Sequence, residues 1–264
     1  SSNTTLLHWV PQHAIPSWIG ALLVVQIVRS RQNLFLLPII SLSALLWSPF
    51  AAVGITLLAF LLLVNSGVIP KFFADLRKFP ILIFSLVVIG IPVVAFLQSG
   101  TSDIPHSLLL AHGSFAHNIK MLLEFIPLEF GIISGFTIFL LREKLRENLI
   151  ISIGLIFVLM IVVGLYNDFA MRVSPALLVV ILVNACDALF TAPKRGLHQL
   201  VHIALVGVLA VGAITPLFEF VTRYQTPFTS LQSPCIDTGC DSSLISLELR
   251  NYTWTGQRAI FLKK

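Results

Sequence analysis

The stretch Leu34–Val64, LFLLPIISLSALLWSPFAAVGITLLAFLLLV, decides how the chain crosses a membrane. Ser48-Pro49 interrupts its apolar run, and a proline ends or kinks a helix because it lacks an N–H and its ring clashes with the preceding turn. The run could therefore form a tight hairpin of two helices, a re-entrant loop or one kinked helix. A hairpin and a single span place the preceding loop on opposite sides of the membrane.

The composition around this stretch is that of a membrane protein. The chain is 56% hydrophobic and only 11% charged, whereas a soluble domain has roughly 25% charged residues. Its net charge of +5 does not indicate nucleic-acid binding, because the basic residues lie in short loops between apolar runs. We expect an all-α, polytopic transmembrane helical bundle.

A transmembrane helix needs about 20 predominantly apolar residues. With Leu34–Val64 as a hairpin, the sequence predicts about eight spans, some of them short. They are 15–28, 34–47, 50–64, 81–97, 122–141, 149–165, 175–192 and 198–218.

Positive charge favours the hairpin. It places ten of the seventeen Lys and Arg residues in four short loops on one side: Arg29, Arg31, Lys71, Arg77, Lys78, Arg142, Lys144, Arg146, Lys194 and Arg195. Lys and Arg accumulate in cytoplasmic loops, so this side is predicted to be cytoplasmic. Both chain ends are then extracytoplasmic, and we expect a multi-pass protein of a bacterial inner membrane.

The domain boundaries follow from the same pattern. Residues 1–218 are expected to form the transmembrane helical domain, and residues 219–264 an extracytoplasmic C-terminal tail. The tail carries Cys235 and Cys240, and two close cysteines outside the cytoplasm suggest a local disulfide. Cys186 lies inside a predicted span, where we expect a small apolar filler.

The most unusual polar segment is Tyr166–Pro175, YNDFAMRVSP, between two apolar runs. Charged residues near a bilayer usually face a partner or a cavity. Asp168 and Arg172 are four residues apart and would share a helix face, so they could form a structural ion pair. Alternatively, Arg172 could offer its planar fork to a phosphate, while Asn167 or Asp168 holds sugar hydroxyls.

A second polar segment, Pro11-Gln12-His13, precedes the first span. It is either a helix-entry loop or part of the same extracytoplasmic site. Five of the seven histidines fall on that side, namely His8, His13, His106, His112 and His117. Their spacing does not match that of a zinc site, so no metal site is predicted, and histidines contacting headgroups and water are the simpler interpretation.

Two of these segments and the chain's ending resemble parts of large bacterial polytopic proteins that are similar to GT-C membrane glycosyltransferases. The resemblance covers Tyr166–Leu177, His8–Ala14 and Gln257–Lys264. It implies that the chain is the C-terminal half of such an enzyme, acting on a polyprenyl-phosphate-linked sugar. Gln12, His13, Asn167, Asp168 and Arg172 would bind this substrate.

The resemblance leaves the catalytic residue unassigned. The family places a catalytic acid in the first external loop, whereas the first inter-span loop here, 29–33, has no acid and is predicted to be cytoplasmic. The expected partners are membrane lipids and either other membrane subunits or a missing N-terminal half; no cofactor is expected. A structural or accessory subunit of a membrane complex is the alternative function. A lipid or solute transporter is the third, although the sequence shows no inverted repeat.

Overall fold

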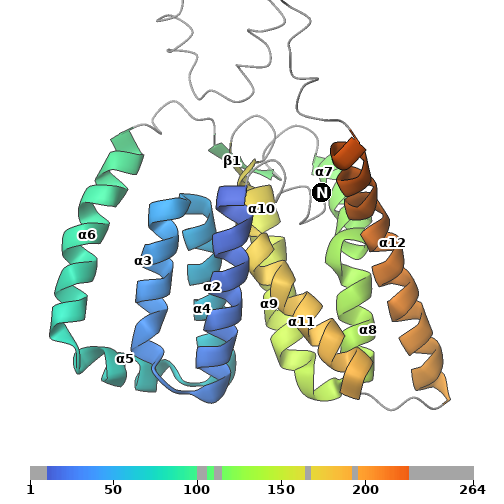
Figure 1. Cartoon of the computed structure of the whole chain (residues 1–264), viewed down its shortest axis with the longest axis horizontal. Coiled ribbons are helices and arrows are strands. Elements are labelled where there is room, and N and C mark those ends of the chain that lie inside the picture. Colours follow the sequence, from blue (N-terminus) through green and yellow to red (C-terminus); the bar gives the residue numbers. More distant parts are fainter. Residues whose placement is uncertain (1–10, 100–105, 110–114, 164–167, 192–195, 226–264) are drawn as a thin grey trace, which may run out of the picture. The chain divides into compact units, whose positions relative to one another are not determined.

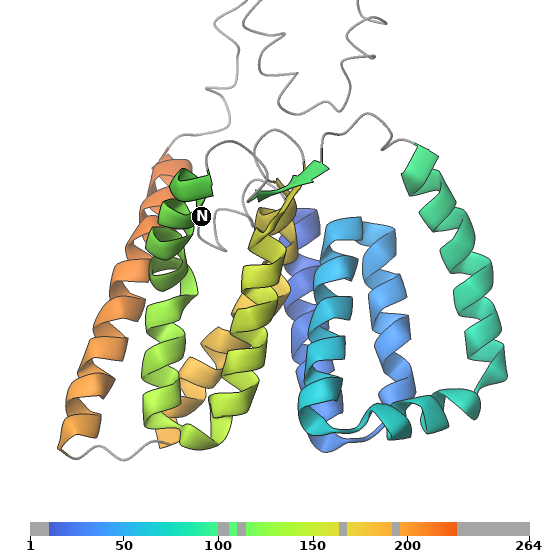
Figure 2. The same ribbon diagram turned by 180° about the vertical axis from the view of Figure 1, so that it is seen from behind.

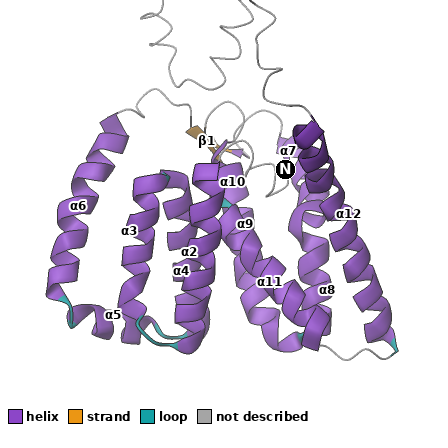
Figure 3. Cartoon of the chain, in the orientation of Figure 1, coloured by secondary structure: helices purple, strands orange, loops and turns teal. Residues whose placement is uncertain are grey.

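The computed structural model describes residues 11–99, 106–109, 115–163, 168–191 and 196–225, which are mostly helical (Figure 3). The chain divides into two units, Ser1–Pro216 and Leu217–Lys264. Most of the predicted tail, including Cys235 and Cys240, lies outside the described residues, so the tail and its disulfide stay predictions.

Between Pro11 and Ser99 the described structure has five α-helices and one short 3-10 turn (Figure 1). They are α2 (Pro11–Ser30), η1 (Leu34–Leu36), α3 (Leu37–Trp47), α4 (Pro49–Ser66), α5 (Ile69–Arg77) and α6 (Pro80–Ser99).

The hairpin predicted at Ser48-Pro49 is present. Ser48 is the single residue between α3 and α4, and its backbone is extended, with φ −158°. Its side-chain oxygen accepts a hydrogen bond from the Ala51 N–H, and Pro49 occupies the first turn of α4, where its missing N–H costs nothing. The two helices pack side by side (Figures 1 and 2).

The second half also consists mainly of helices. They are α7 (Phe115–Ile126), the π-helical segment η3 (Pro127–Gly131), α8 (Ile132–Leu140), the 3-10 turn η4 (Arg142–Lys144), α9 (Leu145–Leu159), α10 (Asp168–Val173), α11 (Pro175–Thr191) and α12 (Leu197–Gln225). Segments α7, η3 and α8 follow one another without a break, and the π-helical part begins at Pro127, which cannot donate a backbone hydrogen bond.

One predicted span is wrong at its end. The run 149–165 was expected to be a single helix, but α9 ends at Leu159 and Ile161–Val163 forms strand β2. This strand pairs antiparallel with β1 (His106–Leu108), with Ser107 opposite Val162. The β-branched sequence Ile161-Val162-Val163 favours a strand over a helix. Within the described residues the fold is therefore mostly helical, with one small two-stranded sheet.

Among the described residues, four helical segments are long and apolar enough to span a membrane, judged by length and composition, which indicates a membrane protein. They are His13–Ser30, Pro49–Ser66, Asn118–Leu140 and Leu197–Ile214. Three of the other predicted spans correspond to shorter apolar helices, Leu34–Trp47, Pro80–Pro92 and Pro175–Thr191. The count of eight stays a prediction.

The main core lies between α2, α4, α9 and α11 and includes Val24, Ile55, Ile151 and Leu177, each at most 2% exposed. Gly54 of α4 faces the chain at the end of α10, where a Cβ would clash with the Val173 carbonyl oxygen. This close approach brings α10, with Arg172, against the first turns of α4.

Candidate functional site

Two of the segments selected from the sequence meet at the start of α4. His13 of α2 is buried, with 7% of its surface exposed. Its Nδ1 shares a hydrogen bond with Ser48 Oγ at 2.5 Å, and its ring lies edge-on to Phe50, with centroids 5.8 Å apart. His13 therefore joins α2 to the α3–α4 turn and does not face headgroups.

Arg172 reaches the same phenyl ring from α10. Its guanidinium carbon lies over Phe50, 5.4 Å from the ring centroid, within the range of a cation–π interaction. Phe169, one turn earlier on α10, contacts Phe50 edge-on, with centroids 6.2 Å apart. We call His13, Ser48, Phe50, Phe169 and Arg172 the aromatic cluster.

For the remaining predicted site residues, the structure gives at most the position of the backbone. Gln12 lies in the first turn of α2 and Asp168 begins α10, but their side chains are outside the described part of the structure. Asn167 is likewise outside the described residues. The predicted pairing of Asp168 with Arg172 is therefore untested, although the helical turn that it requires is present.

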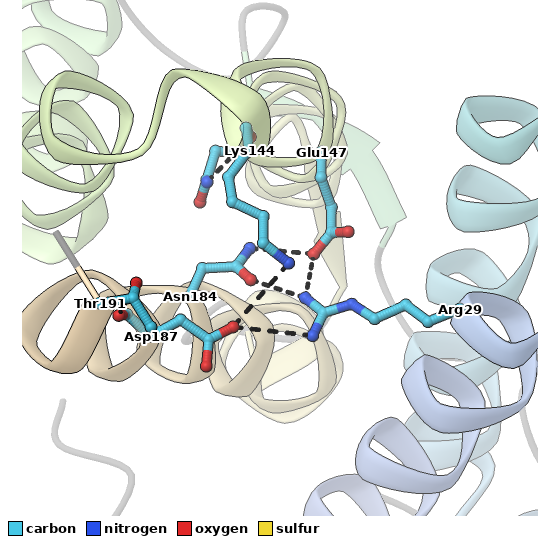
Figure 4. Close-up of polar contacts among 7 residues, drawn as sticks. Arg29, Lys144, Glu147, Asn184, Asp187 and Thr191 are labelled. Carbon is cyan, nitrogen blue, oxygen red and sulfur yellow. Dashed lines mark hydrogen bonds and ion pairs between the residues drawn. The ribbon is translucent and has the colours of Figure 1, made fainter.

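A second polar cluster joins α2 to α9 and α11 (Figure 4). Arg29 Nη2 donates to Glu147 Oε1 at 2.6 Å and to Asn184 Oδ1 at 2.7 Å, and Asn184 Nδ2 donates to the same Glu147 oxygen at 3.0 Å. Asp187 Oδ2 lies 3.9 Å from Arg29 Nη1 and 3.8 Å from Lys144 Nζ. We call Arg29, Lys144, Glu147, Asn184 and Asp187 the ionic cluster.

The ionic cluster keeps Glu147 charged. Burial alone would raise the pKa of this carboxyl group, but the hydrogen bonds from Arg29 and Asn184 and the charges of Arg29 and Lys144 lower its pKa below the ordinary 4.5. Asn184 is fully buried, and its amide bridges the side chains of Arg29 and Glu147.

A solvent-facing hollow of about 370 Å³ lies beside this cluster. It is lined by Arg29, Asn65, Glu143, Lys144, Arg146 and Glu147. Its cations and acids come from the ends of several helices, so the hollow is polar but carries no dominant charge.

The contacts also bring the predicted cytoplasmic loops together. Arg29 contacts Glu147, Lys144 contacts Asp187, and Lys71 Nζ donates to the Arg31 carbonyl at 2.7 Å. Loops that the charge pattern assigned to one side thus lie at one end of the helices. Which side of the membrane this is remains a prediction.

Sequence reasoning missed the partners in both clusters. Phe50 and Phe169 are ordinary aromatic residues of apolar runs, and only their proximity to Arg172 distinguishes them. The ionic cluster had a detectable signal: Glu147, Asn184 and Asp187 are polar residues near the ends of runs that share a side with Arg29. Cys186, expected to be a small apolar filler inside a span, has an exposed side chain on α11.

Among the described residues, no group of three or more His, Cys, Asp or Glu side chains is placed to hold a metal ion. Comparison with protein-family models, curated proteins and solved structures found no match to this chain. The function is therefore argued from the two clusters and from the resemblance of the short segments.

Proposed function

We propose that this protein is a membrane-embedded GT-C-like glycosyltransferase, or the C-terminal part of one, which binds a polyprenyl-phosphate-linked sugar at the aromatic cluster. The observation that carries the proposal is the meeting of His13 and Arg172 on the Phe50 ring. These two residues come from the two polar segments that resemble the family, and they are far apart in the sequence.

The chemistry of Arg172 supports a phosphate ligand. A cation–π contact uses the face of the guanidinium, whereas its N–H donors point outward in the plane. Those donors match two phosphate oxygens at once. Phe50 contacts the guanidinium through its face, and in this proposal the in-plane donors of Arg172 bind the phosphate.

His13 has a different role in this proposal. Because it is buried and bonded to Ser48, it positions the α3–α4 turn and hence Phe50. Gln12, Asn167 and Asp168 would supply the polar contacts to the sugar. In such a reaction a base removes the acceptor proton while cations stabilise the leaving phosphate; we assign the cation to Arg172 and leave the base unassigned.

The test compares Arg172→Lys with Lys120→Gln in the purified full chain. Lys120 is a cation of α7 on the same predicted side, with its side chain 75% exposed and paired only loosely with Glu124 at 3.9 Å. Affinity for a polyprenyl phosphate should fall about tenfold in Arg172→Lys, since lysine cannot form the bidentate contact, and should stay unchanged in Lys120→Gln.

Thermal melting must show that both variants remain folded. If folded Arg172→Lys protein binds the lipid phosphate as tightly as the parent, the phosphate site is refuted and a structural role for Arg172 is the better explanation. Transfer of sugar from the polyprenyl-phosphate donor then tests whether the bound lipid is a substrate.

The second candidate is a structural or accessory subunit of a membrane complex. The ionic cluster favours this structural role. Its charged side chains pair with one another between helices, which is the arrangement expected of residues that hold helices together. This candidate predicts no polyprenyl-phosphate binding by the chain alone, so the same titration separates the two functions.

A further inference from the structure

Helix α5 differs from its neighbours in direction. It lies crosswise at the end of α4 and at the start of α6, whereas those two helices run along the bundle (Figures 1 and 2). No residue of α5 is buried. A short helix across the ends of apolar helices lies where a membrane surface would be.

The residues of α5 are sharply divided between two faces. Ile69, Phe72, Phe73 and Leu76 fall within an arc of about 100° on the helix. Ile69 and Phe72 pack against the main core, which fixes the rotation of the helix. Phe73 belongs to the same arc, yet 53% of its surface is exposed.

The rest of the segment is basic. Between Ile69 and Lys78 the chain carries Lys71, Arg77 and Lys78 against a single acid, Asp75, a net charge of +2. Asp75 and Lys78 form an ion pair at 2.9 Å, and Lys71 donates to the Arg31 carbonyl. Arg77 takes part in neither contact and is exposed.

We propose that α5 is an interfacial helix that binds anionic phospholipid on the side where the basic loops gather. Phe73 enters the boundary between headgroups and acyl chains, and the cations contact lipid phosphates, with Arg77 making the main contact. Basic residues near the membrane surface are attracted to an anionic leaflet, so the basic residues of this segment select anionic over zwitterionic lipid.

This surface is separate from the polyprenyl-phosphate site. The aromatic cluster lies at the first residues of α4, whereas α5 follows its last, and the 18 residues of α4 rise about 27 Å. The two proposals can therefore fail independently.

The depth of α5 is tested first, by spin labelling. Phe73→Cys and Ala74→Cys are labelled singly in a full chain whose native cysteines are replaced by serine, and the protein is reconstituted in bilayers. The label at 73 should collide mainly with oxygen and the label at 74 mainly with a water-soluble nickel chelate. Equal exposure of both labels to the chelate would overturn the interfacial placement.

Lipid selectivity is tested by native mass spectrometry, which detects the lipids that stay bound to the protein. The protein is taken from detergent micelles that contain equal amounts of phosphatidylglycerol and phosphatidylcholine. The parent should retain phosphatidylglycerol preferentially, and Arg77→Gln with Lys78→Gln should lower that preference by about fivefold or more. Lys120→Gln, at the other end of the helices, should leave it unchanged. An undiminished preference in the folded double variant, or equal retention of both lipids by the parent, would refute the proposal.

Discussion

Arg29 and Arg172 each stand near the end of a helix, but their surroundings differ. Arg29 lies among two carboxylates and an amide: its Nη2 donates hydrogen bonds to Glu147 and Asn184, and its Nη1 forms an ion pair with Asp187. Arg172 lies against a phenyl ring, which attracts the cation without accepting conventional hydrogen bonds. An arginine among carboxylates is suited to tying helices together, whereas the proposed phosphate site requires Arg172 to receive an anion.

The largest effect is expected when the arginine of the ionic cluster is removed, which tests whether Arg29 holds the helices together. Arg29→Ala leaves Glu147, whose side chain is 12% exposed, without its strongest donor. We expect a loss of about 2–3 kcal/mol, the cost of losing hydrogen bonds to a shielded charge. Chemical denaturation in detergent measures it.

A matched double variant sharpens this result. Arg29→Met with Glu147→Leu removes both charges and should destabilise the protein less than Arg29→Ala, because an apolar pair can replace an ion pair without leaving a lone charge. A double variant as unstable as the single one would contradict the assignment of the cost to an unpaired Glu147.

The aromatic cluster should respond more weakly. Phe50→Leu keeps most of the apolar volume but removes the ring that His13, Phe169 and Arg172 contact. We expect a loss of about 1–2 kcal/mol from the aromatic and cation–π contacts, together with weaker polyprenyl-phosphate binding. Phe60→Leu is the control, since Phe60 is exposed on the same helix.

If Phe50→Leu lowers stability while leaving lipid-phosphate binding intact, the ring has only a structural role. Arg172 would then have a structural role like that of Arg29, and the proposed phosphate site would be refuted. Denaturation and lipid titration on the same preparations distinguish these outcomes.

The smallest expected effect concerns pH. The folded-state pKa of Glu147 is lowered below 4.5, so its contribution to stability is present above that value and is lost as pH falls through the folded-state pKa. Thermal melts of the parent between neutral pH and pH 3 should show this loss. Glu147→Gln should have a flatter profile, and an equally steep profile would show that other carboxylates dominate.

The apolar runs were sufficient to predict most helices, because length and hydropathy determine where an α-helix can cross a bilayer. Pro49 correctly marked the hairpin, since its ring prevents the helix from continuing. Strand β2 was missed because Ile161-Val162-Val163 is as apolar as the helix before it, and its pairing with β1 is a long-range contact that no local pattern reveals.

The candidate site was predicted only in part. His13 and Arg172 were identifiable because polar residues beside apolar runs are costly. Their common partner was not, since Phe50 is one of 20 phenylalanines and only the close packing of α4 against α10 at Gly54 selects it. Glu147 and Asn184 were detectable only as polar residues near the ends of apolar runs, because their partner Arg29 is more than 100 residues away in the sequence.

The hairpin has a consequence for how the chain enters a membrane during its synthesis. Its first arm, Leu34–Trp47, is an apolar segment of 14 residues and rises about 21 Å, less than the hydrocarbon thickness of about 30 Å. A segment this short inserts poorly into a bilayer by itself. Because only Ser48 separates it from the longer α4, we expect the two helices to insert together as a hairpin. If this arm spans the bilayer as predicted, thinning of the surrounding lipid would accommodate its short length, and the protein should partition into the thinner regions of a mixed bilayer.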